Sequence, residues 1–426
     1  MVATLAGSRR PTLKELPLSR ETQRRYAALD GLRGIAALTV FAIHVWIYQL
    51  PNTVQLRRDS WEKTLLFEGR VAFVMFFCLS GYLLYRAFAR AALREGDPVN
   101  VRSYLVRRAA RIVPAYYVAI LGTLALLWAA GDVPGRRLVD AAQVPLFFVF
   151  GQNYSPDTLL KLNAATWTLA VEVVFYLMLP VIGWLALRTC RGRVGRQAAL
   201  LAGLAVVGLA WNAIDYAAGW GPVASHSPPS FLPYFACGML VALLVEWRRT
   251  QGAAPLGRGT SAALVAGAAA VLVLNGWWHA TFAHDTVAME VLADSGAALA
   301  FAAIIASLVL GTGTGVRWMG LRPLAWMGEI TYGFYLWHIP LLVCARGLGI
   351  LPSGIVLGLA VLPVAIAFGA ASWYWIERPI MRRAGRMPRA AAEELPTAAT
   401  SERSRSRIPD RSGPQPASSS GRAAAS

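Results

Sequence analysis

The sequence predicts an all-α, polytopic integral membrane protein with about ten transmembrane helices. Three observations predict this class. Of the 426 residues, 56% are apolar and only 15% are charged, which leaves too few polar groups to cover a water-soluble surface. Apolar runs of about 20 residues recur along the chain, and a helix of that length spans a bilayer. The basic residues concentrate in every second loop between these runs, as the positive-inside rule requires.

Ten apolar runs define the expected helices, and a few charged residues interrupt them. The runs lie near residues 34–50, 71–89, 112–130, 164–187, 198–214, 231–245, 260–278, 291–310, 324–346 and 354–376. The interrupting residues are Arg86, Glu172, Asp294 and Glu329. A further apolar stretch at 138–151 contains Asp140 and Pro145 and is shorter than a membrane span. We expect it to form a re-entrant or interfacial segment.

The formal net charge is +18, and its distribution predicts the topology. The basic residues fall between apolar runs, so they indicate membrane orientation, and we do not expect nucleic-acid binding. Placing both termini in the cytoplasm puts most of these residues on the inner side of the plasma membrane. If 138–151 crossed the membrane, the later basic loops would move outside, so the charge pattern favours the re-entrant interpretation.

We expect three regions along the chain. Residues 1–25 form a disordered cytoplasmic N-terminus, residues 26–383 the membrane domain, and residues 384–426 a disordered cytoplasmic tail rich in Ala, Ser, Arg and Pro. We expect no secretory signal peptide and no appended soluble catalytic domain. The four cysteines have no CxxC spacing, so they predict neither a disulfide framework nor a metal site.

Three ionisable residues within apolar runs are candidates for chemistry, because such groups are costly in a membrane. They are His44, Glu172 and His338. At 1.5 Å of rise per residue, His44 and Glu172 each lie about 10 Å below the outer surface, so they can meet as a general base oriented by a carboxylate. Alternatively, His44 bonds a backbone carbonyl of a neighbouring helix, Glu172 serves proton transport, and His338 only packs beside Trp337.

Arg33 lies 11 positions before His44, which is about three helical turns. Both residues therefore share one helix face, about 16 Å apart. This spacing suits an extended cofactor arm whose anionic end Arg33 holds and whose reactive end meets His44. Alternatively, Arg33 is a topogenic charge paired with Asp30.

Two further motifs carry candidate binding residues. Arg107, Arg108 and Arg111 occur at helical spacing near one face, where guanidinium groups suit phosphate oxygens. Such clusters also fix orientation or bind anionic lipid. Ser80 and Gly81 permit close approach of a ligand, although close packing of two helices also explains them.

These segments together resemble the acyltransferase-3 family of polytopic membrane O-acyltransferases, over residues 26–383. Five motifs agree in order. They are LDGLRG through His44, FFCLSGYLLYR, RRAARIVPAYY, TWTLAVEVVFYLMLP, and ITYGFYLWHIP with WYWIERP. Thr168 stands where the family usually has Ser, and Val173 and Val174 stand where a second acidic residue often follows Glu172.

The resemblance implies cytoplasmic acyl-CoA as the donor, a hydroxyl acceptor and His44 as the essential base. It assigns the donor's phosphates to the arginines, namely Arg33, Arg107, Arg108 and Arg111. Many relatives also carry a periplasmic esterase-like domain, and we expect none here. The chain is then either self-sufficient, a homo-oligomer, or dependent on a separate esterase-like partner.

We therefore expect a membrane O-acyltransferase that uses no metal. It transfers a short acyl group, such as acetyl, from acyl-CoA to a hydroxyl of a glycan, glycolipid or glycosylated metabolite. His44 deprotonates this hydroxyl and Glu172 orients His44, while Ser80, His338 or a backbone N–H stabilises the oxyanion. The alternatives are a transporter of an acylated or glycosylated molecule and a membrane assembly subunit without chemistry.

Overall fold

The computed structural model describes residues 20–49, 69–94, 98–131, 138–281, 291–292, 294–311, 317–349 and 354–385. Regular structure in these residues is helical, apart from one isolated β-bridge between Leu256 and Gly311. The predicted N-terminal region 1–25 falls outside the description up to residue 19, and residues 20–25 already belong to the first helix. The predicted tail lies outside it from residue 386 onward.

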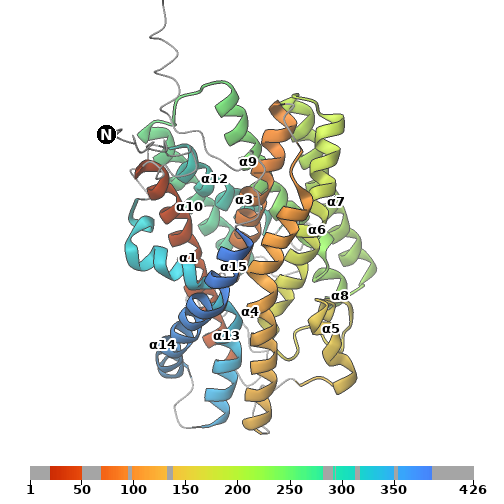
Figure 1. The fold of residues 1–426 in the computed structure, drawn as a ribbon, viewed down its shortest axis with the longest axis vertical. Coiled ribbons are helices and arrows are strands. Elements are labelled where there is room, and N and C mark those ends of the chain that lie inside the picture. The colour runs from red at the N-terminus through yellow and green to blue at the C-terminus, as the bar shows by residue number, and fades with distance from the viewer. Residues whose placement is uncertain are drawn as a thin grey trace, which may run out of the picture. The chain divides into compact units, whose positions relative to one another are not determined.

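Long helices pack side by side through this part of the chain (Figure 1). They are α1 (Arg20–Gln49), α3 (Ala72–Arg94), α4 (Val101–Ala129), α6 (Trp167–Thr189), α7 (Val194–Ala218), α9 (Leu232–Thr250), α10 (Arg258–Thr281), α12 (Ser295–Leu310), α13 (Arg322–Gly347) and α14 (Ile355–Ala371). The shorter helices are α5 (Val144–Phe148), α8 (Pro222–Ser225) and α15 (Arg378–Ala384), and a π-helical segment η8 (Ser372–Glu377) joins α14 to α15.

Each of the ten predicted apolar runs falls on one of these long helices. In the described residues, eight helices are long and apolar enough to cross a membrane. The other two are α12, which has only 16 residues, and α13, in which Glu329 and His338 lower the hydropathy. The prediction of an all-α, polytopic membrane protein is confirmed.

The stretch at 138–151 forms a 3-10 turn, η3 (Ala141–Gln143), followed by the five-residue helix α5. A helix of that length rises about 7 Å, so it cannot cross a bilayer. Two tyrosines of α4 hold it in place: the Tyr116 hydroxyl donates to the carbonyl of Phe147 at 2.9 Å, and that of Tyr117 donates to Phe148 at 2.8 Å. As predicted, this stretch is not a crossing.

Glycines bring α3 close to α9, its most extensively packed neighbour. A Cβ on Gly238 of α9 would lie 1.8 Å from the carbonyl oxygen of Cys78, and one on Gly81 of α3 would lie 2.3 Å from that of Phe235. Only glycine permits this backbone approach, which is a common way of packing membrane helices. Gly81 thus serves helix packing, one of the two interpretations of its motif.

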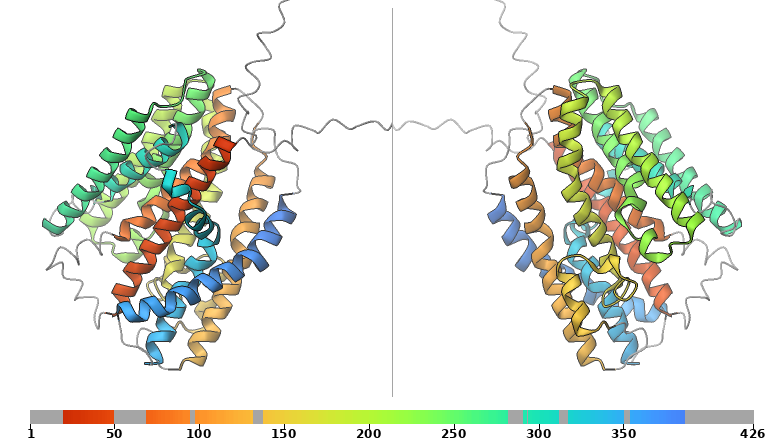
Figure 2. Two further views of the ribbon diagram at one scale, coloured as in Figure 1. Left: turned by 90° about the vertical axis from the view of Figure 1, so that its left-hand side faces the viewer. Right: turned by 90° about the vertical axis from the view of Figure 1, so that its right-hand side faces the viewer.

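A second close approach joins α1 to α13. A Cβ on Gly328 would lie 1.9 Å from the carbonyl oxygen of Asp30, and one on Gly34 would lie 2.6 Å from that of Leu324. The side views show α1 and α13 running together (Figure 2). Because α1 carries Arg33 and His44 and α13 carries His338, this interface brings candidate residues from distant parts of the sequence into contact.

Candidate active site

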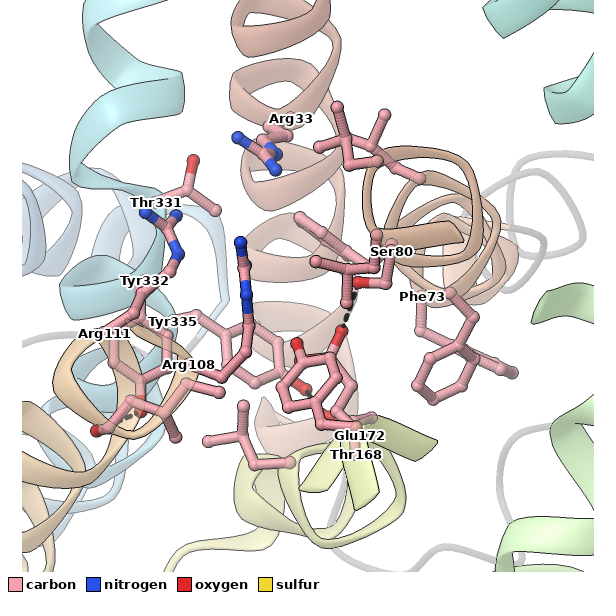
Figure 3. Close-up of a pocket in the computed structure, with 18 of the residues that line it drawn as sticks. Arg33, Phe73, Ser80, Arg108, Arg111, Thr168, Glu172, Thr331, Tyr332 and Tyr335 are labelled. Atoms are coloured by element: carbon pink, nitrogen blue, oxygen red, sulfur yellow. Dashed lines mark hydrogen bonds between the residues drawn. The ribbon is translucent and has the colours of Figure 1, made fainter. Parts of the chain in front are cut away.

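A cavity lies between α1, α3, α4, α6 and α13 (Figure 3). About 850 Å³ of space lies within it, open solvent at its mouth included. The predicted site residues that line it are Arg33, Ser80, Arg108, Arg111 and Glu172, and Thr168 lines it as well. The structure therefore gathers most of the predicted polar residues around one space.

Three arginines form one part of the cavity wall. Arg33 comes from α1, and Arg108 and Arg111 come from α4; their guanidinium groups point toward the same region (Figure 3). Arg33 also forms an ion pair with Asp30, with an N–O distance of 3.0 Å. The geometry is therefore compatible with both interpretations of Arg33, because it pairs with Asp30 and also lines the cavity.

Arg107 differs from the other arginines, because it does not line the cavity. Its guanidinium group donates to the hydroxyl of Ser103 one turn earlier on α4. Neighbouring helix positions point about 100° apart, so Arg107 and Arg108 cannot both face the same space. The expectation that all the α4 arginines share one binding face is wrong in this respect.

Opposite the arginines, Glu172 is bound by two hydroxyl groups. Ser80 Oγ donates to Glu172 Oε1 at 2.8 Å, and the Tyr176 hydroxyl donates to Oε2 at 2.9 Å. All three side chains line the cavity. In the described residues no hydrogen bond joins Glu172 to His44, so the predicted pair of these residues does not form. That prediction rests only on the depth of the two residues in the membrane. Depth does not specify which helices lie opposite each other.

His44 instead contacts His338. Their rings lie 5.0 Å apart between centroids, and Nδ1 of His44 lies 3.1 Å from Nε2 of His338. Each Nδ1 also lies near a carbonyl of its own helix: Val40 at 2.9 Å from His44, and Tyr335 at 2.7 Å from His338. The carbonyl partner of His44 is therefore on its own helix, not on a neighbouring one.

These contacts define the tautomers of both neutral rings. A carbonyl oxygen only accepts hydrogen bonds, so each Nδ1 carries the proton. Nε2 of His338 then has a lone pair that can accept from Nδ1–H of His44. Nε2 of His44 is left with a lone pair and has no hydrogen-bond partner among the described residues. This nitrogen is therefore available to take a proton.

The histidine pair lies just beyond the cavity wall. Neither ring lines the cavity, but Tyr335 does, and its ring lies 5.5 Å from that of His338. Phe76, another lining residue, lies 6.3 Å from the ring of Tyr335. The Tyr335 hydroxyl also lies 2.8 Å from that of Thr168. Tyr335 is thus the lining residue that contacts the histidine pair.

Sequence reasoning missed Tyr176 and Tyr335. Tyr176 follows Glu172 by four positions, a helical spacing that places two side chains next to each other, so this signal was present. Tyr335 carries no such signal, because its partner Thr168 lies on another helix. Only the tertiary contacts of its hydroxyl with Thr168 and the carbonyl of Ala165 identify it.

The fold and site define a polytopic membrane protein with an internal cavity lined by arginines and one carboxylate. The profile of the acyltransferase-3 family, described as an acyltransferase domain, matches residues 26–375. The chain belongs to this family, which confirms the predicted resemblance. It is therefore a membrane acyltransferase, and the transporter and assembly-subunit alternatives are not supported.

Named relatives agree with this assignment. Acyltransferase MdmB from Streptomyces mycarofaciens is 28% identical, with 89% of this chain and 97% of the relative covered. Peptidoglycan O-acetyltransferase OatA from Listeria monocytogenes is 24% identical, with 85% of this chain covered but only 57% of the relative. Nodulation protein 10 from Rhizobium leguminosarum is 28% identical, with 83% and 92% covered. No solved structure matches the chain.

Proposed function

We propose that the protein transfers a short acyl group from cytoplasmic acyl-CoA to a hydroxyl of a glycan, glycolipid or glycosylated metabolite. The observation that carries this proposal is that the arginines, Ser80 and Glu172 line one cavity, and that the histidine pair contacts its lining residue Tyr335. This arrangement suits a donor with an anionic end and a distant reactive carbonyl.

The arginines are the proposed site for the donor's phosphates. Guanidinium groups bind phosphate oxygens through paired, charge-assisted hydrogen bonds. Arg33, Arg108 and Arg111 meet this need together, while Asp30 balances one of the three charges. On α1 the distance from Arg33 to His44 is about 16 Å at 1.5 Å per residue, so a long pantetheine-like arm is needed to connect the two.

His44 is the proposed general base, acting through Nε2. As this nitrogen takes a proton from the acceptor hydroxyl, the ring becomes positive, and Nδ1–H donates more strongly to Nε2 of His338 and the carbonyl of Val40. His338 thus takes the orienting role that we had expected of Glu172. A correctly oriented base contributes about 10²–10⁴ in rate.

The acceptor is inferred from the relatives. One is named as a peptidoglycan O-acetyltransferase, which supports a carbohydrate hydroxyl as the acceptor. Since this chain spans only 57% of that relative, a separate esterase-like partner or a homo-oligomer remains part of the proposal. Comparing cell-surface glycans and small molecules from a deletion strain by mass spectrometry tests the acceptor class.

Removing the base tests the core of the proposal. In purified protein given labelled acyl-CoA and extracted acceptor, we expect His44→Ala to reduce acceptor-dependent release of CoA by about 10²-fold or more. His226→Ala is the matched control, because His226 lies in the loop between α8 and α9, away from the histidine pair. Equal rates for His44→Ala and the wild type would refute the role of the base.

Substituting His338 tests its orienting role. We expect His338→Ala to lower kcat roughly tenfold, because a hydrogen bond to a charged group is worth about 1.5–3 kcal/mol. His338→Gln should recover part of this loss, since its amide oxygen can accept from Nδ1–H of His44. The acidic limb of the pH profile of kcat should shift to lower pH in His338→Ala, because the imidazolium of His44 loses a stabilising partner and gives up its proton more readily. A structural role alone would leave the profile unmoved.

A further inference from the structure

The cavity contains a second constellation that the proposed mechanism does not use. Ser80 Oγ donates to Glu172 Oε1, and Tyr176 donates to the other carboxylate oxygen. A nucleophile within hydrogen-bond reach of a base, with that base oriented by a third group, is the signature of covalent catalysis. Here the three roles fall to a serine, a carboxylate and a phenol that share one cavity wall.

The position of Ser80 also favours contact with the donor. Ser80 and Glu172 are half-buried and line the cavity, whereas His44 and His338 do not line it. Ser80 lies four residues from Phe76 on α3, a rise of about 6 Å. Ser80 and Glu172 line the same cavity as Arg33, Arg108 and Arg111.

We propose that Ser80 accepts the acyl group first, as an ester, and that Glu172 is the base for this half-reaction. The proposal rests on the function proposed above, because it requires an acyl thioester as the donor. It divides the reaction between two bases: Glu172 serves the donor, and His44 serves the acceptor. Tyr176 is a positioning residue that holds the carboxylate toward Ser80.

The first half-reaction balances without any further reactant. Ser80 Oγ attacks the thioester carbonyl, its proton passes to Glu172, the carbon–sulfur bond breaks, and CoA leaves as a thiolate that takes a proton from water. The arginines lie on the same cavity and favour the negative charge that develops.

In the second half-reaction, the acceptor oxygen attacks the ester carbonyl and gives its proton to His44. The bond to Ser80 Oγ then breaks, and Glu172 returns the proton it had taken. His44 finally releases its proton to water. The acyl group has moved from sulfur to the acceptor oxygen, and the enzyme is restored.

The alternative is that Ser80 only ties α3 to α6 through its hydrogen bond. A matched control exists for this role: Ser307 of α12 is buried and bonds Ser261 of α10, away from the cavity. If the hydrogen bond of Ser80 is merely structural, Ser80→Ala and Ser307→Ala should have similar effects on stability and little effect on transfer.

Acid quenching of full-length protein with acyl-labelled acyl-CoA, in the absence of acceptor, tests the proposal. We expect a burst of about one CoA per active site, with the label on the peptide that contains Ser80. The burst should persist in His44→Ala and Ser307→Ala, slow at least tenfold in Glu172→Gln, and disappear in Ser80→Ala. Ser80→Cys should keep the burst and carry the label as a hydroxylamine-sensitive thioester, which guards against a folding defect in Ser80→Ala.

Two results would overturn the acyl-serine while leaving the proposed function intact. One is acceptor-dependent transfer by Ser80→Ala at a rate close to that of the wild type. The other is transfer by the wild type with no label on the Ser80 peptide and none on cysteine in Ser80→Cys. Failure of the proposed function itself looks different: wild-type protein would then move no label from acyl-CoA to any acceptor.

Discussion

At the scale of single residues, the arginines of α4 show that a shift of one position along a helix changes which surroundings a side chain faces. Arg108 and Arg111 face the cavity, whereas Arg107 turns to Ser103. All three have the same charge and chemistry, and they lie within two turns of one helix. Their different directions therefore provide an internal comparison for donor binding.

We expect the double substitution Arg108→Gln with Arg111→Gln to raise KM for acyl-CoA by tenfold or more, because each charge-assisted hydrogen bond is worth about 1.5–3 kcal/mol. The value of kcat at saturation should change less, since the arginines act on binding. Arg107→Gln should change KM by less than about threefold, the usual small effect of a residue outside the site. Steady-state kinetics measures both; equal KM values for the double variant and Arg107→Gln would contradict the assignment.

At the scale of elements, small residues decide which helices touch. Gly81 and Gly238 join α3 to α9, and Gly34 and Gly328 join α1 to α13. Lipid is as apolar as most side chains, so close van der Waals packing, not the hydrophobic effect, selects these interfaces. The first interface supports the helix that carries Ser80, and the second brings His44 to His338.

Gly238→Ala should destabilise the protein by about 1–3 kcal/mol, the usual cost of overpacking, because its Cβ would overlap the carbonyl of Cys78. Gly267→Ala on α10 is the control, since nothing lies within 4 Å of a Cβ there. It should be neutral or stabilising, because alanine favours a helix over glycine by about 1 kcal/mol. Thermal unfolding in detergent compares the two variants. A melting temperature for Gly238→Ala at or above that of Gly267→Ala would show that the α3–α9 contact tolerates a side chain.

At the scale of the whole described bundle, burial separates central from peripheral helices. The apolar window of α9 is 72% buried, whereas those of α7 and α10 are each only 17% buried. We infer that α7 and α10 face lipid over most of their length. The cavity is built from α1, α3, α4, α6 and α13, so α7 and α10 do not contribute to the site.

The ten predicted crossings would place both ends of the chain on one side, which the charge pattern predicts to be the cytoplasm. We expect a cysteine at Trp220, in the loop after α7, to react with an impermeant maleimide in intact cells. A cysteine at Gln251, after α9, should react only once the membrane is opened. Both loops lie outside the helices that span the membrane. Labelling of Gln251→Cys in intact cells would reverse the predicted orientation.

Hydropathy, charge and spacing in the sequence determined the helices, their order and the polar residues within them. These follow from transfer free energy along the chain, which depends on composition and not on neighbours. The same reasoning predicted Arg33 and the α4 arginines as binding candidates and His44, Glu172, His338 and Ser80 as candidates for chemistry. It also placed the stretch at 138–151 outside the set of crossings.

Only the tertiary structure decided which of these residues meet. Depth alone suggests that His44 pairs with Glu172. In the folded protein His44 instead contacts His338, and Glu172 accepts hydrogen bonds from Ser80 and Tyr176. Sequence reports how deep a side chain lies and which face of its own helix it occupies. Which helix lies opposite that face depends on close approaches such as Gly328 against Asp30, and these form between segments far apart in the chain.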